Sequence, residues 1–175
     1  MPIPKLYLKS SMDVNLLTDN LQSYIDDTVI SVFDTMLGME LSPSVPGAFF
    51  RVTEPQLIGM VGLAGSVTAL VCLRVPESFS HRLTRAMMGL AEEEALSEPD
   101  INDVIGELAN ITAGKLKSCF RIADQPCNLS LPTIIRGHTI EVESVSGAKR
   151  HSYTFLHENE PIVVEFYSYN QEEKG

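Results

Sequence analysis

A set of polar residues and glycines recurs in residues 101–117 at a spacing that suits one face of a helix. Asp103, Glu107, Asn110 and Gly114 are separated by intervals of four, three and four residues, so at about 100° per residue they form one narrow stripe. The opposite side is apolar: Ile101, Val104, Ile105, Leu108 and Ile111. The pattern predicts a helix that packs its apolar side on the core and holds a carboxylate and a carboxamide in solvent.

Glu107 and Asn110 could act together on one small site of a partner, since three residues of helix span about 4.5 Å. A neutral carboxamide is too weak a base to take a proton from water, but it can hold a water in line for attack on a phosphoryl group. This chemistry requires that the partner supply the phosphoryl group and Mg²⁺. The same stripe is also compatible with an ordinary solvated helix face.

Two glycines interrupt the predicted helix, Gly106 and Gly114. Each costs about 1 kcal/mol relative to alanine in a helix interior. We expect both to lie on the exposed side, where they would allow another surface to approach closely. No catalytic nucleophile or metal-ligand pattern accompanies them: the cysteines follow no CxxC spacing and the histidines are scattered, so we expect no cofactor of the chain's own.

The composition predicts one domain over residues 1–175, with flexible ends at 1–12 and 170–175, because a chain of this length with 44% hydrophobic residues can bury a sizeable core. The net charge of −10 argues against a nucleic-acid partner. We find no leader-like apolar segment and no stretch of about eighteen apolar residues, so we expect a cytoplasmic protein without a membrane partner.

Hydrophobic periodicity predicts three main helices packed on one face of a largely antiparallel sheet of about six strands, a two-layer α+β fold. The helices are expected at residues 19–37, 77–90 and 99–120, with a loop at 42–47. The β-rich segments are 48–53, 57–63, 66–75, 128–131, 133–144 with a bend at Gly137, 153–157 and 162–169.

The first and third predicted helices also share a pattern. A shift of 76 residues aligns four residues of the first, Asp27, Ser31, Asp34 and Gly38, with the stripe. Duplicated halves would produce this alignment, and so would coincidence between two amphipathic helices.

The stripe, followed by Pro132, resembles the signature of the CheC/CheX/FliY chemotaxis phosphatases, and residues 32–39 resemble the first helix of the CheX branch. The resemblance extends over nearly the whole chain. It implies a CheC-like fold with pseudo-twofold related halves. It also implies a homodimer formed through the sheets, for which residues 153–169 could supply the edge.

The activity that the resemblance implies is hydrolysis of the aspartyl phosphate of a CheY-type response regulator, which ends a chemotaxis signal. Asn110 would orient the attacking water and Glu107 would pair with the regulator's active-site lysine, while the regulator supplies Mg²⁺. Asp103, Gly106 and Gly114 would support the motif or contact the partner.

Two other functions remain compatible with the sequence. The chain could be a docking module that binds a response regulator or a flagellar or signalling protein without hydrolysis. A small-molecule-binding domain would need an apolar pocket with convergent polar groups, and the sequence indicates none.

Overall fold

The computed structural model describes residues 14–45, 54–65, 68–119, 127–143 and 147–169. The helices are α1 (Val14–Leu37), α2 (Glu77–Met88) and α3 (Glu98–Cys119). The strands are β1 (Ser42–Pro43), β2 (Gln56–Gly65), β3 (Thr68–Pro76), β4 (Cys127–Leu129), β5 (Thr133–Gly137), β6 (Lys149–His157) and β7 (Glu160–Tyr169).

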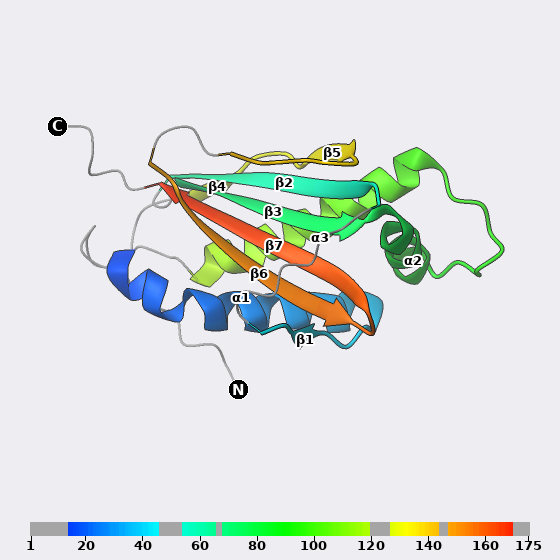
Figure 1. Ribbon diagram of the computed structural model, residues 1–175, viewed down its shortest axis with the longest axis horizontal. Coiled ribbons are helices and arrows are strands. Elements are labelled where there is room, and N and C mark those ends of the chain that lie inside the picture. Colours follow the sequence, from blue (N-terminus) through cyan, green and yellow to red (C-terminus); the bar gives the residue numbers. More distant parts are fainter. Residues whose placement is uncertain (1–13, 46–53, 66–67, 120–126, 144–146, 170–175) are drawn as a thin grey trace.

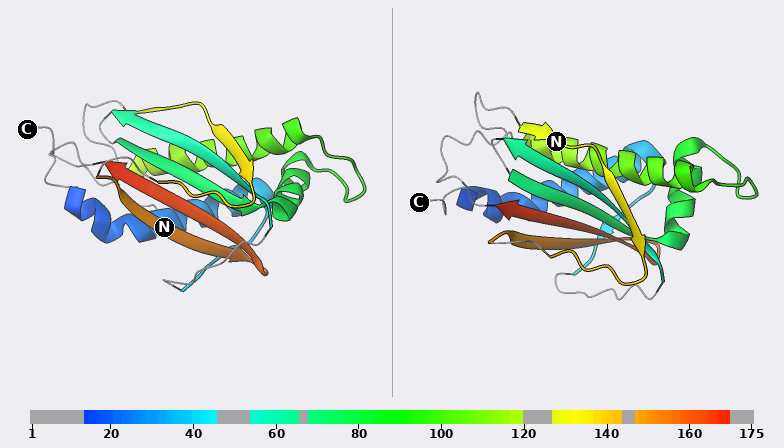
Figure 2. Two further views of the ribbon diagram at one scale, coloured as in Figure 1. Left: turned by 45° about the horizontal axis from the view of Figure 1, so that its top comes forward. Right: turned by 90° about the horizontal axis from the view of Figure 1, so that it is seen from above.

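The seven strands form one antiparallel sheet in the order β1-β6-β7-β3-β2-β4, and β5 also pairs with β2. The helices α1 and α3 lie side by side on one face of this sheet, and α2 packs at its end (Figure 1; Figure 2). The predicted two-layer α+β fold is therefore confirmed, with seven strands where about six were expected.

The strand order is symmetric about the boundary between β3 and β7. The β2–β3 hairpin lies on one side of this boundary and the β6–β7 hairpin on the other, and each outer strand pairs with a further short strand. Such an order is what two duplicated halves would form. The 76-residue register between α1 and α3 stays a prediction, because α1 ends at Leu37 whereas its aligned position in α3 is followed by six more helical residues.

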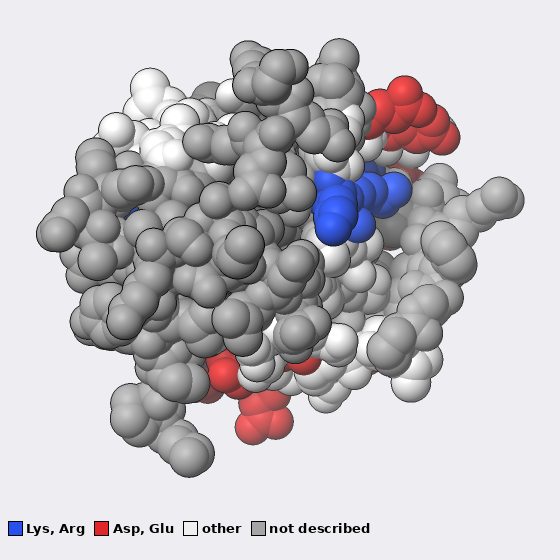
Figure 3. All heavy atoms as spheres, turned by 90° about the vertical axis from the view of Figure 1, so that its left-hand side faces the viewer, with Lys and Arg blue, Asp and Glu red and all other residues white. Residues whose placement is uncertain are grey.

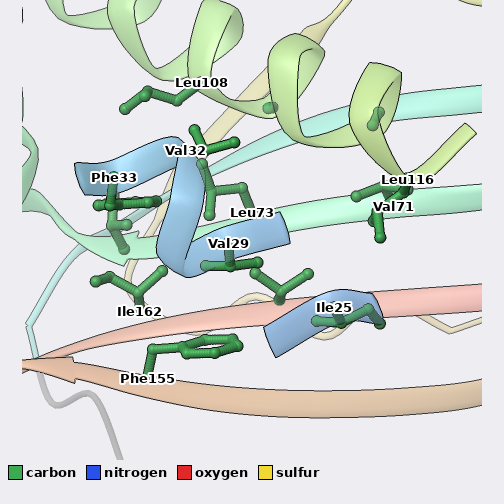
Figure 4. Packing of buried hydrophobic residues seen from close by; sticks show 14 of the residues in the cluster. Ile25, Val29, Val32, Phe33, Val71, Leu73, Leu108, Leu116, Phe155 and Ile162 are labelled. Atoms are coloured by element: carbon green, nitrogen blue, oxygen red, sulfur yellow. The ribbon is translucent and has the colours of Figure 1, made fainter. Parts of the chain in front are cut away.

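The core lies between α1, α3 and the sheet. In Figure 4, Val29, Val32 and Phe33 of α1 point toward side chains of the sheet and of α3. These residues share a helical spacing with Met36, which is nevertheless 38% exposed. Gly38 caps the C-terminus of α1, since it has φ +64° and its N–H donates to the carbonyl of Asp34 at 2.9 Å.

The opposite face of the sheet carries a smaller cluster that residues 138–143 cover. Ile140 and Val142 pack against buried Ile58, Cys72 and Tyr167. Burial, with a contribution from the nearby Glu165 carboxylate, raises the pKa of the Cys72 thiol to about 12. This thiol is therefore protonated at neutral pH and has no nucleophilic character, as expected for a core cysteine.

A buried carboxylate on the same face is neutralised by two arginines. Glu165 has a side chain that is 1% exposed; it accepts from Arg74 at 3.2 Å and from Arg150. Arg74 also donates to the carbonyl of Ile140 at 3.0 Å, which ties the covering segment to the sheet. The two ion pairs and this hydrogen bond explain how the charged Glu165 carboxylate can be buried on this face of the sheet.

Several predicted boundaries were wrong. The expected strand at 133–144 ends at Gly137, because the chain then leaves the β2 edge to cross the opposite face. The expected loop at 42–47 contains β1, which pairs with β6. The segment 153–169 does not form an edge as a whole, since β7 lies between β3 and β6. The expected strand at 48–53 and the ends at 1–12 and 170–175 lie outside the described residues.

The helix α3 lies very close to the sheet at Gly59 of β2. A Cβ atom at Gly59 would lie 2.8 Å from Cβ of Ala109 and 3.0 Å from the carbonyl oxygen of Ile105. A side chain at this position would therefore push α3 away from the sheet.

Gly59→Ala should lower the free energy of unfolding by about 1–3 kcal/mol, because the added methyl group meets helix backbone that cannot move aside. Denaturant unfolding measures this change. The matched control is Gly62→Ala on the same strand, where the nearest atom is 3.6 Å away and we expect a change within about 0.5 kcal/mol. Equal stability of the two variants would contradict the close packing.

Candidate functional site

The helix α3 begins at a capping arrangement that the sequence encodes locally. The Asp100 N–H donates to the Ser97 hydroxyl at 3.3 Å, and the Ser97 N–H donates to the Asp100 carboxylate at 3.3 Å. Glu98 and Asp100 also place negative charge in the first turn, where the helix dipole favours it. The start of the helix is thereby fixed one turn before the candidate site.

The predicted stripe lies on the outer side of α3. Asp103 and Glu107 are exposed, and Asn110 and Gly114 are partly exposed. Four of the five apolar residues predicted for the opposite side are buried, and Ile111 is partly buried against the core: Ile101, Val104, Ile105, Leu108 and Ile111. The helix therefore has the orientation that the spacing predicts.

The glycines of this helix face the chain itself, which corrects the sequence interpretation. Gly106 is buried, and a Cβ atom there would lie 3.5 Å from Pro132 and 3.8 Å from Ile134. A Cβ atom at Gly114 would lie 3.7 Å from Leu129. The segment that joins β4 to β5 thus lies along α3. At Gly106 this segment occupies the space that the sequence interpretation leaves open for a partner.

The contact with Pro132 brings a residue of the signature to the site. Pro132 is distant from the stripe in sequence, but it packs on α3 one turn from Asn110. This proline is exposed on its other side. The structure therefore brings together the stripe and Pro132, the two parts of the signature that the sequence separates.

The other flank of the stripe is formed by α1. The Nζ atom of Lys115 donates to the Ser31 hydroxyl at 3.0 Å, which links the outer surfaces of the two helices. The candidate site is therefore a ridge, with α1 on one side and the β4–β5 segment on the other.

The polar groups of the ridge are not used by the rest of the described chain. The side chains of Asp103, Glu107 and Asn110 form no hydrogen bond or ion pair with any residue that the structure describes. Their oxygens, and the amide of Asn110, are available to a partner. This is the property that a water-positioning amide and a pairing carboxylate require.

We also searched the described residues for other kinds of site. Within them, no group of three or more His, Cys, Asp or Glu could hold a metal ion. None of their helices is both long enough and apolar enough to cross a membrane. Figure 3 shows the end of the molecule at the left of Figure 1, where most of the visible basic atoms gather right of centre and acidic side chains lie above them and at the bottom of the view.

Comparison with known proteins assigns the chain to a family. The family described as "Chemotaxis phosphatase CheX" matches residues 57–156, which include all of α3 and Pro132. The chain therefore belongs to the CheX family of chemotaxis phosphatases, and the resemblance inferred from the stripe is confirmed. The class of enzyme that this family represents is a phosphatase, as the sequence predicts.

Individual relatives agree with this assignment. The CheY-P phosphatase CheX of Thermotoga maritima is 27% identical over 118 residues, which cover 65% of this chain and 76% of the relative. The crystal structure of a chemotaxis protein CheX from Desulfovibrio desulfuricans matches with a TM-score of 0.71 and 17% identity, covering 86% of this chain and 99% of that chain.

A further similar structure is that of a CheX–CheY–BeF₃–Mg²⁺ complex from Borrelia burgdorferi. It matches with a TM-score of 0.63 and 19% identity, over 84% of this chain and 96% of that chain. At this identity the match shows that the fold is shared.

Gly106→Ala should raise the free energy of unfolding by up to about 1 kcal/mol, because alanine is the better helix former and its methyl group would meet Pro132 at an ordinary contact distance of 3.5 Å. Gly106→Leu should instead displace Pro132 and lower stability. Thermal or denaturant unfolding of both variants measures the effects. Destabilisation by alanine as large as that by leucine would contradict the observed space above Gly106.

Proposed function

We propose that this chain hydrolyses the aspartyl phosphate of a phosphorylated CheY-type response regulator and so ends a chemotaxis signal. Membership of the CheX family supports this reaction. The structural observation that carries it is the pair Glu107 and Asn110, which stand on the outer side of α3 with side chains that no described residue engages. A convex ridge of this kind suits a protein substrate, which can bring its own concave site to the helix.

In this proposal Asn110 enters the regulator's active site and orients the attacking water. Its carboxamide can accept one hydrogen bond from the water and donate another to the phosphoryl oxygens, but it cannot remove a proton. Placement is sufficient, because catalysis of phosphoryl transfer depends mainly on in-line positioning and on stabilisation of charge by groups already present. The proposed catalytic contribution of this chain is therefore geometric.

Glu107 has a different role in the proposal, which is to pair with the active-site lysine of the regulator. It lies about 4.5 Å from Asn110 along the helix axis, so both side chains can reach one active site. The regulator supplies Mg²⁺, and the chain needs no cofactor of its own. The complex solved for the Borrelia burgdorferi relative, which contains CheX, CheY and Mg²⁺, supports this division.

The remaining motif residues support the two that act. Asp103 lies one turn before Glu107 on the exposed side and is placed to contact the regulator. Gly114, one turn beyond Asn110, has no side chain that would project from the ridge toward the regulator. Gly106 contributes indirectly in this proposal, because a side chain larger than a methyl group at this position would displace Pro132.

Three statements stay predictions: that residues 1–175 form a single domain, that the protein is cytoplasmic, and that it forms a homodimer. Light scattering measures the mass of the chain in solution, and a monomer would contradict the homodimer.

Asn110→Ala should reduce the accelerated release of phosphate from a Mg²⁺-bound, phosphorylated CheY-type receiver by about 100-fold or more, because the water is no longer held in line. The fold should be unchanged, since Asn110 is a partly exposed polar residue. The measurement is decay of the phosphorylated receiver with and without each variant. Asn159→Ala, an exposed asparagine in the turn between β6 and β7, is the matched control.

Normal turnover by Asn110→Ala would contradict the mechanism. Tight binding of the receiver without hydrolysis by the wild-type chain would instead favour the alternative function, a non-catalytic docking module.

Glu107→Gln should raise the KM for the phosphorylated receiver by about tenfold, which corresponds to the loss of about 1.4 kcal/mol from a desolvated ion pair. Because the variant keeps the shape of the side chain but removes its charge, its KM should also depend less on ionic strength than that of the wild-type chain. Steady-state hydrolysis at several salt concentrations measures both quantities. An unchanged KM at low salt would exclude the pairing with a lysine.

A further inference from the structure

An apolar side chain projects into solvent from the segment that flanks the candidate site. Leu131, in the segment that joins β4 to β5, is 88% exposed and is the most exposed of the large hydrophobic residues that the structure describes. Its neighbours Ser130 and Pro132 are also exposed. Single exposed hydrophobic residues are common on protein surfaces, so the position and support of this one decide whether it has a role.

The backbone of this leucine is fixed on both sides. The N–H of Ser130 donates to the carbonyl of Gly62 at 2.9 Å, and the N–H of Gly62 donates to the Ser130 hydroxyl at 2.9 Å. The same hydroxyl donates to the carbonyl of Leu131 at 2.9 Å. On the other side, Pro132 packs on α3 at Gly106. The backbone that carries this side chain is therefore already ordered, so a partner that covers Leu131 does not have to order the segment first.

The same contacts place Leu131 next to Asn110. Leu129 packs at Gly114 and Pro132 packs at Gly106; these glycines are two turns apart, about 12 Å along the axis, and Asn110 lies halfway between them. Around the axis, Asn110 is rotated by about 60° from Glu107 toward the side of Gly106. Leu131 therefore flanks the side of the ridge on which Asn110 lies.

We propose that Leu131 is a docking contact for the phosphorylated receiver domain, and that it packs against apolar surface beside the phosphorylated aspartate while Asn110 enters the active site. This inference rests on the proposed function and adds a specificity-determining residue to it. A receiver that brings Asn110 and Glu107 into its active site must also approach the neighbouring segment, because Pro132, the residue after Leu131, packs on the same helix at Gly106.

Charge alone is a poor source of affinity for this complex. The ridge presents Asp103 and Glu107, and the chain as a whole has a formal charge of −10. The partner carries an additional phosphoryl group, whose negative charge is offset by its own Mg²⁺ and lysine. An apolar contact contributes affinity without opposite charge, because the leucine surface that a partner covers is removed from water.

The experiment is steady-state hydrolysis with the Mg²⁺-bound, phosphorylated CheY-type receiver that the wild-type chain dephosphorylates fastest. Leu131→Asp should raise KM by about tenfold and Leu131→Ala by about threefold, with kcat within about twofold of wild type, because the contact is made equally in the ground state and the transition state. The matched control is Val45→Asp. Val45 is 75% exposed and follows β1 at the opposite edge of the sheet, so the KM of Val45→Asp should equal that of the wild-type chain.

Three results would overturn the proposal. One is a KM for Leu131→Asp equal to that of Val45→Asp. Another is a fall in kcat at constant KM, which would mean that the segment acts on the chemistry and not on docking. The third is a change in mass by light scattering in Leu131→Asp, which would show that a second copy of this chain covers the leucine. If the wild-type chain accelerates decay of no receiver, the proposed function itself fails, and that outcome is distinct from the other three.

Discussion

The close contact of α3 with β2 at Gly59 is the constraint on which the candidate site depends. With no side chain at this position, Ala109 and the backbone of Ile105 rest directly on the sheet. This contact fixes the height of the helix above β2. The outer side of α3 then lies level with the segment after β4, so that Pro132 reaches Gly106. A helix held farther from the sheet would leave Pro132 without its contact.

The strand β2 also positions the other half of the site. Its backbone at Gly62 forms two hydrogen bonds with Ser130, three residues beyond the point where α3 is seated. One strand therefore supports both the helix with Asn110 and the segment with Leu131. Because both supports rest on the backbone of β2, the separation between the backbone of Asn110 and that of Leu131 is set by the sheet.

The sequence predicted the parts of this arrangement that depend on local periodicity. A stripe of polar residues opposite Ile105 and Leu108 can be recognised without knowledge of the fold, because the spacing of a helix is the same everywhere. The environment of Gly106 could not be recognised in this way. An exposed glycine and a glycine beneath a distant proline have the same local sequence, and only the pairing of β4 and β5 with β2 distinguishes them.

Long-range pairing explains the other differences as well. The strand β1 is only two residues long and contains a proline, so its composition is that of a loop, and its pairing with β6 is determined by a partner more than 100 residues away. In contrast, β5 ends at Gly137 because the apolar residues that follow, Ile140 and Val142, pack on the opposite face of the sheet. Their alternation continues the strand pattern, and the sequence alone does not indicate which surface they cover.

The symmetry of the sheet raises the question of why a single helix carries the site. Both α1 and α3 lie on the same face, and each has polar residues along its outer side. On α1, however, Ser31 accepts a hydrogen bond from Lys115, so part of that surface is already engaged by its neighbour. The edge beyond β6 is occupied by β1, whose two residues pair with Phe155 and Leu156. On α3 the edge segment lies along the helix and presents Leu131 beside Asn110. In our proposal the ridge acts through the edge segment as well as the helix, and among the described residues the two lie together on the α3 side.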